Sequence, residues 1–189
     1  MSRAYVGAKA KGYLAKRAGT RKWKRENKLV ELMLAGTRGD VLDVPVGTGR
    51  FVRLYKKLGL RFTGLDLSED MVAIALKELG KGGERGTVST GDAAKLPYPA
   101  KYFDAVVCVR LLHLLKEKEM SDVMRQICRV ARSRVVLTIQ LGPKFSSTPD
   151  VQTHNERRFG ELVTDLGFLC AEDHKITGAG WHVMRLERA

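Results

Sequence analysis

Acidic residues and glycines occur directly after three short apolar runs in the first half of the chain. The first run ends in DVPVGTGR, where Gly47 and Gly49 let the backbone turn tightly and approach a ligand closely. The helix expected to start there offers unpaired N–H groups. Asp66 and Asp92 follow the second and third runs. Their carboxylates can accept hydrogen bonds from ribose hydroxyls and from an adenine amino group. Alternatively, the glycines form a plain strand-to-helix turn and the two acids only cap helices.

The elements that must position these residues are short strands alternating with helical patterns. Ser68 is expected to cap one of the helices. Alternation of this kind predicts βαβ units and a parallel sheet. Ligands of such sheets bind beyond the carboxyl ends of the strands, so the three motifs would form one nucleoside pocket. The expected strands are 40–44, 61–65, 87–90, 103–109 and 134–140, and the expected helices are 51–58, 68–79, 119–131 and 154–166.

The remainder of the chain adds one loop and two further β-type runs. The stretch 141–150 is rich in Gly, Pro and Ser and is expected to be a loop. Segments 168–173 and 181–186 close the chain as strands. No second-domain linker is visible, so we expect one globular domain, with a basic helical segment at 1–37 packed on a core of 38–189.

Four motifs in order resemble those of the class I S-adenosylmethionine-dependent methyltransferases. They are VLDVPVGTGRF, GLDLSEDMV, GDAAKLPYPAKYFDAVVCVRLLHLL and RVVLTI, and they cover roughly residues 38–140. The resemblance implies an α/β fold, a Rossmann-like three-layer sandwich. Its mostly parallel seven-stranded sheet would have the last strand antiparallel. The cofactor implied is S-adenosyl-L-methionine, and no metal is implied.

The resemblance assigns one group of residues to the methionine end of the cofactor. Val109 would contribute backbone near the sulfonium, and Tyr13 and Arg17 would approach the methionine carboxylate. The acids that often follow such tyrosines are missing in this chain. The residues placed under the methionine part are Asp43, Val44, Pro45, Gly47 and Gly49.

A second group belongs to the adenosine end by the same resemblance. Asp66 would hold the ribose hydroxyls, with Leu67 and Met71 against the adenine side. Asp92 and Ala93 would bind the edge of the adenine ring. Taken by itself, the GxG motif at Gly47 and Gly49 is also compatible with a nicotinamide-dependent oxidoreductase. That class favours GxGxxG, however, and the position three after Gly49 is Val52.

The sulfonium of this cofactor already makes its methyl group electrophilic. The protein therefore mainly has to align an acceptor for in-line displacement. His113 is a candidate base, although a histidine in an apolar stretch is often simply packed. Arg110 is a candidate partner for an anionic group. The acceptor is expected to be a small molecule. RNA or protein methylation through the basic N-terminus, and a non-catalytic S-adenosylmethionine- or RNA-binding module, stay open.

Basic residues concentrate at the start of the chain. The net charge is +13, and residues 1–40 hold 11 Lys/Arg against three acids, a net +8. Three interpretations of this segment are open. It is a solvated surface, a binding surface for an anionic partner such as nucleic acid, or a transit peptide. The longest apolar runs are too short for a membrane span. Three scattered cysteines suggest buried thiols in a reducing compartment, and we expect a cytoplasmic protein without membrane contact.

Overall fold

The computed structural model describes residues 19–80, 86–147, 151–177 and 180–189. Helices and strands alternate along them as the sequence predicts. The elements are α2 (Arg21–Leu34), β1 (Asp40–Asp43), α3 (Val52–Lys57), β2 (Arg61–Asp66), α4 (Glu69–Gly80), β3 (Gly86–Thr90), β4 (Phe103–Cys108), the 3-10 turn η1 (Leu112–Leu114), α5 (Glu117–Val130), β5 (Ala131–Gly142), β6 (Ser146–Ser147), β7 (Gln152–Asn155), α6 (Glu156–Asp165), β8 (Phe168–Thr177) and β9 (Trp181–Arg188).

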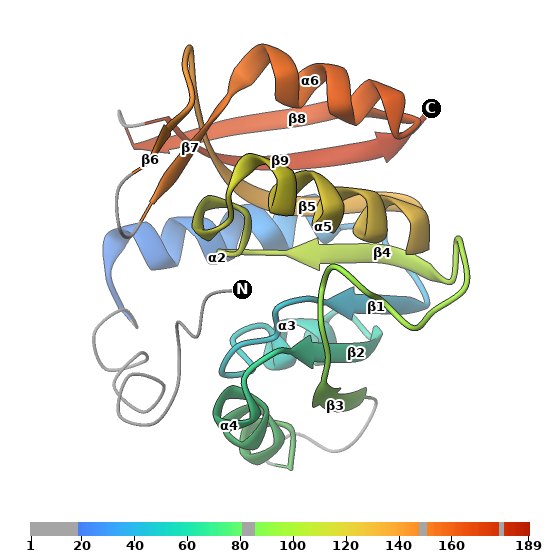
Figure 1. Ribbon diagram of the computed structural model, residues 1–189. Coiled ribbons are helices and arrows are strands. Elements are labelled where there is room, and N and C mark those ends of the chain that lie inside the picture. Colours follow the sequence, from blue (N-terminus) through green and yellow to red (C-terminus); the bar gives the residue numbers. More distant parts are fainter. Residues whose placement is uncertain (1–18, 81–85, 148–150, 178–179) are drawn as a thin grey trace.

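The main sheet runs in the order β3-β2-β1-β4-β5-β9-β8 (Figure 1). The first five of these strands pair in parallel, and β9 is antiparallel to both of its neighbours. The predicted mostly parallel sheet with an antiparallel last strand is therefore confirmed. Strand order reverses between β1 and β4, which is where open α/β sheets bind their ligands.

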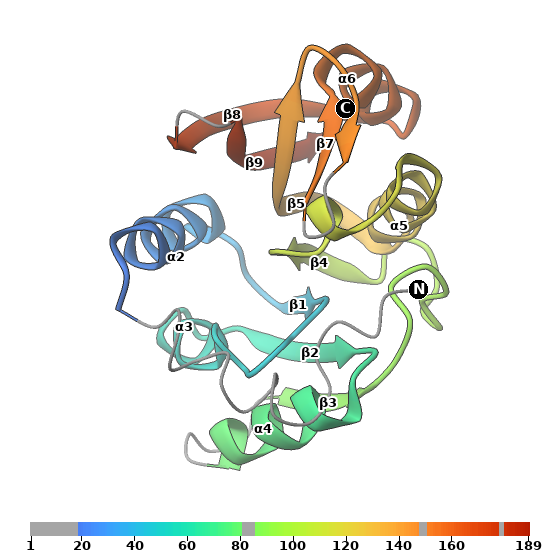
Figure 2. The ribbon, with the colours of Figure 1, turned by 60° about the vertical axis from the view of Figure 1, so that its left-hand side comes forward.

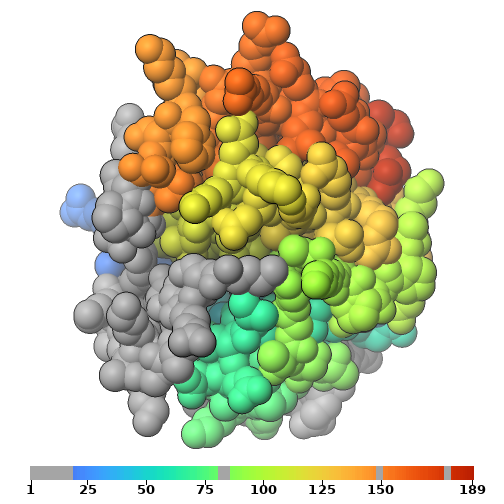
Figure 3. Space-filling model, in the orientation of Figure 1, coloured from blue at the N-terminus to red at the C-terminus, as the bar shows by residue number. Residues whose placement is uncertain are grey.

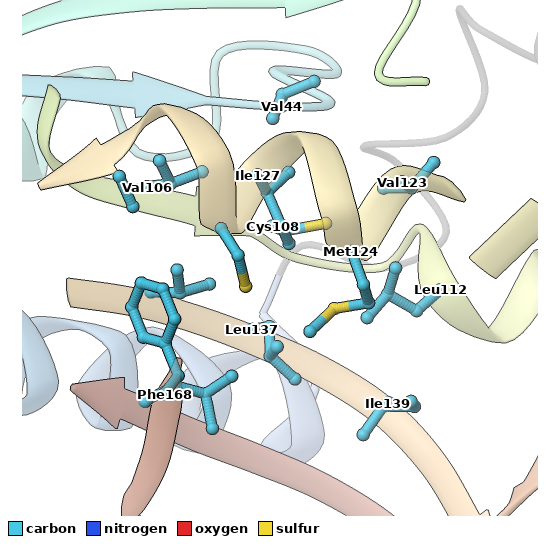
Figure 4. Close-up of a cluster of buried hydrophobic side chains, with 14 of the residues drawn as sticks. Val44, Val106, Cys108, Leu112, Val123, Met124, Ile127, Leu137, Ile139 and Phe168 are labelled. Atoms are coloured by element: carbon cyan, nitrogen blue, oxygen red, sulfur yellow. The ribbon is translucent and has the colours of Figure 1, made fainter. Parts of the chain in front are cut away.

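Helices cover both faces of the sheet and make three layers, with α2 and α3 on one side and α5 and α6 on the other (Figure 2). The apolar residues of α5 recur at helical spacing, so one stripe faces the sheet. Met124 and Ile127 of that stripe pack against Leu137 and Phe168 (Figure 4). Figure 3 shows the outer surface of this layer, formed by α5 and α6.

Helix α2 begins after Thr20, whose hydroxyl accepts a hydrogen bond from the amide of Trp23 at 3.2 Å. Val30, Met33 and Leu34 are buried against the sheet face that α3 also covers. None of the described helices is long and apolar enough to cross a membrane. Tyr13 and Arg17 lie outside the described residues.

Some expectations require correction. The stretch 141–150 is not simply a loop, because β5 continues to Gly142 and β6 pairs with β7. His154 belongs to β7 rather than to the helix, which begins two residues later. The sheet thus gains two short strands beyond the predicted seven. Cys108 and Cys128 are buried as expected, but Cys170 is exposed on β8, which pairs with β9 at one end of the sheet.

Candidate active site at the carboxyl edge of the sheet

The carboxyl ends of four neighbouring strands are tied together at the predicted pocket. Backbone N–H groups just beyond the end of one strand donate to carbonyls of the strand beside it. These hydrogen bonds bring the three motifs to one edge of the sheet. The bonds run from Val44 to Val107 at 2.9 Å, from Val46 to Leu65 at 2.8 Å and from Gly91 to Asp66 at 2.9 Å. We call this region the carboxyl edge.

Asp66 joins the glycine loop to the start of α4. Its Oδ2 accepts from the Gly47 amide at 2.9 Å, and its Oδ1 accepts from the Ser68 amide at 2.9 Å. Burial raises the pKa of this carboxyl, while these backbone N–H groups oppose the shift. A carboxylate offers about four acceptor sites, so Asp66 retains acceptor capacity for a ligand hydroxyl.

The other predicted adenosine residues lie around the ends of β2 and β3. Asp92 accepts from the Ala94 amide at 2.9 Å through Oδ1, which orders the turn after β3. Met71 is buried, whereas Leu67 is 51% exposed and presents an apolar side chain next to Asp66. Ala93 is half-buried and packs against the core.

The two loop glycines have different surroundings. Both have positive φ, 55° at Gly47 and 76° at Gly49. Among the described residues, a Cβ at Gly47 would meet no heavy atom within 4 Å, whereas one at Gly49 would lie 3.3 Å from the Ala75 Cα. Gly49 therefore permits close packing of α4 on the loop, whereas no described residue packs against the Gly47 Cα on this side.

Asp43 is the most unusual group at this edge. It is 1% exposed, and its Oδ2 has no hydrogen-bond partner in the described part of the chain. Burial raises the pKa of this carboxyl to about 8, opposed by the nearby Tyr55 hydroxyl and Arg50 guanidinium and helped by Asp66. A buried carboxyl with a free oxygen fits a ligand that carries positive charge or a hydrogen-bond donor, as the methionine part of the implied cofactor does.

Arg110 directly follows the buried Val109, and its side chain turns toward α2. Its Nε and Nη2 donate to the two oxygens of Glu26 at 2.9 Å each. Its backbone has φ of 64°, and its amide donates to the Thr138 hydroxyl at 2.8 Å. The sequence indicated Arg110 as a candidate but contained no indication of this partner.

Glu26 collects donors from three distant elements. Besides Arg110, it accepts from Arg50 Nη1 at 2.7 Å and from the Trp181 indole at 3.0 Å, and it is fully buried. We call these four residues the Glu26 cluster. Sequence reasoning missed it, although Glu26 is the first acidic residue after a run of basic ones.

Two histidines lie close to the end of β4. His113 is buried, with its ring edge-on to Trp181 at a centroid distance of 4.5 Å. The Nε2 of His154 lies 3.0 Å from the Leu112 carbonyl, which can only accept, so Nε2 carries the hydrogen. Burial lowers the pKa of His154, which keeps Nδ1 an acceptor near neutral pH.

Comparisons with known proteins agree with this geometry. The model of a methyltransferase-domain family matches residues 41–134. Demethylmenaquinone methyltransferase of Thermotoga maritima is 40% identical over 87 residues, 45% of this chain and 35% of that protein. Ajmaline N-methyltransferase of Rauvolfia serpentina is 32% identical over 133 residues, 66% of this chain and 45% of that protein. The chain thus spans less than half the length of these relatives.

A solved structure shows the same fold over most of the chain. Magnesium protoporphyrin IX methyltransferase from Synechocystis, crystallised with S-adenosylhomocysteine, superimposes with a TM-score of 0.74 at 20% identity. The match covers 89% of this chain and 84% of that one. The family match, the strand order and the carboxyl edge together show that residues 41–134 form a methyltransferase domain, and that the chain has the Rossmann-like fold of the class I S-adenosylmethionine-dependent methyltransferases.

Proposed function

We propose that this protein transfers a methyl group from S-adenosylmethionine to a small-molecule acceptor. The observation that carries the proposal is the hydrogen bond from the Gly47 amide to Asp66, which closes a glycine loop onto a carboxylate with free acceptor sites. The family match and the relatives named as methyltransferases support the activity and the cofactor.

Different residues of the chain would bind different parts of the cofactor. Asp66 would accept the ribose hydroxyls, Asp92 the adenine amino group, and Asp43 would face the methionine part. S-adenosylmethionine supplies a methyl group already activated on a sulfonium, so the protein has to orient an acceptor and exclude water. His113 would take a proton only from an acceptor that retains one near neutral pH.

A small-molecule acceptor is favoured by the named relatives, which act on a quinone precursor and an alkaloid. RNA and protein side chains are the competing acceptors, because of the basic N-terminal segment. A transfer assay with methyl-labelled cofactor, offering RNA, protein and small-molecule extract separately, decides between them. Label in the small-molecule fraction supports the proposal, and label in RNA or protein alone contradicts it.

Binding of the cofactor is tested by calorimetry. We expect Asp66→Ala to weaken S-adenosylmethionine binding by about 100-fold, since hydrogen bonds to charged groups contribute about 1.5–3 kcal/mol each. The matched control is Asp122→Ala, on the exposed surface of α5, where the carboxylate pairs with Lys118 and Arg125. Absence of binding, or equal affinity of Asp66→Ala and the wild type, would refute the proposed cofactor site.

A further inference from the structure

The Glu26 cluster contains one more positive charge than negative. The Arg50 and Arg110 side chains are 7% and 10% exposed, and both donate to the single carboxylate of Glu26. A buried charge without a counterion is costly, because it has lost the solvation of water. The cluster is therefore a place where a further anion would be stabilised.

The donor atoms identify which arginine could receive this anion. All three nitrogens of Arg50 are used: Nη1 by Glu26, Nε by the Asn27 side chain and Nη2 by the Trp23 carbonyl. Arg110 instead uses only Nε and Nη2, both on Glu26. Within the described residues, its Nη1 has no hydrogen-bond partner. Arg110 thus has donor capacity left at the end of β4.

The surroundings of Arg110 add positive potential. Two cations lie close to the Trp181 ring, with the Arg110 guanidinium carbon 5.3 Å and Lys22 Nζ 3.9 Å from its centroid. Lys22 belongs to the first turn of α2, which contains three basic residues, Arg21, Lys22 and Lys24, and no acidic one. Basic side chains oppose the dipole at a helix N-terminus, so this arrangement weakens the helix but favours a bound anion.

The backbone of Arg110 is also held in an uncommon conformation. A φ of 64° is costly for a residue with a Cβ, and such residues concentrate at functional sites. The hydrogen bond from its amide to the Thr138 hydroxyl fixes this conformation. Since Thr138 lies on β5 and Glu26 on α2, both ends of Arg110 are held by neighbouring elements.

We propose that Arg110, held by Glu26, binds a carboxylate, phosphate or sulfate group of the methyl acceptor. The inference rests on the proposed methyltransferase function and narrows its acceptor to an anionic molecule. The same chemistry could come from the methionine carboxylate of the cofactor, so the experiment has to separate the two sources.

Calorimetric titration with sodium sulfate at constant ionic strength probes the site, with and without saturating S-adenosylhomocysteine. We expect Arg110→Met to weaken sulfate binding by about tenfold or more in both conditions, because a charge-assisted hydrogen bond is lost. The affinity for S-adenosylhomocysteine should stay within about twofold of the wild type, since the proposal places Arg110 on the acceptor and not on the cofactor. Arg110→Met leaves Glu26 paired with Arg50, so the variant should fold, which circular dichroism checks.

The matched control is Arg125→Met on α5, where the arginine is exposed and pairs with Asp122; its sulfate affinity should not change. Two results would overturn the proposal: no sulfate binding to the wild type, or equal sulfate affinity of Arg110→Met. A third is loss of S-adenosylhomocysteine affinity in Arg110→Met without loss for 5′-methylthioadenosine, which lacks the carboxylate. That pattern would assign Arg110 to the cofactor.

Failure of the wild type to bind S-adenosylhomocysteine would instead refute the proposed function. The sulfate titration without S-adenosylhomocysteine would still test whether Arg110 binds an anion.

Discussion

The adenosine side of the carboxyl edge and the Glu26 cluster are built in opposite ways. Asp66 and Asp92 accept hydrogen bonds from amides two residues further along the chain, and Asp66 reaches 19 residues back to Gly47. Glu26 instead bonds to residues 24, 84 and 155 positions away. The first region is thus made by strand–turn–helix geometry, and the second by the packing of α2 on the finished sheet.

The difference has an energetic counterpart. Carboxylates that accept backbone N–H groups are satisfied by groups that the fold places there in any case. A fully buried carboxylate shared by two guanidiniums is different, because its loss leaves two buried positive charges without a counterion. We therefore expect loss of Glu26 to act mainly on stability and changes in the glycine loop to act mainly on ligand binding.

The largest effect is expected for Glu26→Gln. It leaves two buried guanidiniums without a counterion and should lower the free energy of unfolding by about 3–5 kcal/mol, measured by urea denaturation. Glu31→Gln, which breaks an exposed pair with Lys57, should cost about 0–1 kcal/mol. Adding Arg110→Met to Glu26→Gln should recover part of the loss. Equal costs for the two single glutamate variants would contradict the distinction between the regions.

A pH-dependent effect is expected from Asp43. Its pKa is about 8 in the folded protein against an ordinary 3.8, so the folded state holds a proton that the unfolded chain releases between these values. Stability should therefore fall as pH rises from about 4 through 8, by up to about 1.4 kcal/mol per pH unit. Asp43→Asn should lack this slope. Urea denaturation from pH 5 to 8 measures it, and a constant difference between variant and wild type would disprove it.

The smallest effects on stability are expected within the glycine loop. Gly47→Ala puts a Cβ into open space at φ of 55°, which should cost about 1 kcal/mol of stability but lower cofactor affinity about tenfold or more. Gly49→Ala meets the Ala75 Cα at 3.3 Å and should cost about 2 kcal/mol. Thermal unfolding and calorimetry compare the two variants. A greater stability loss in Gly47→Ala than in Gly49→Ala would contradict the roles given to the glycines.

Much of the parallel half of the fold could be predicted from periodicity and turn residues. The strands that end at Asp43 and Asp66 have short apolar runs followed by glycine or acid, and Ser68 does cap α4 through its hydroxyl. The prediction of a plain loop at 141–150 was wrong. Gly, Pro and Ser indicate turns, but they do not reveal that β7 pairs with an extended β5. Pairing partners of that kind depend on register across the sheet.

Sequence by itself determined the family, the parallel sheet and the edge at which its acids and glycines meet, because these depend on local patterns and on the rule that parallel strands end together. Only the tertiary structure decided what those residues touch. It showed that Asp43 is a buried acid with a raised pKa and that Arg110 is held by Glu26. Burial and charge pairing across 84 residues arise from packing, which no local pattern contains.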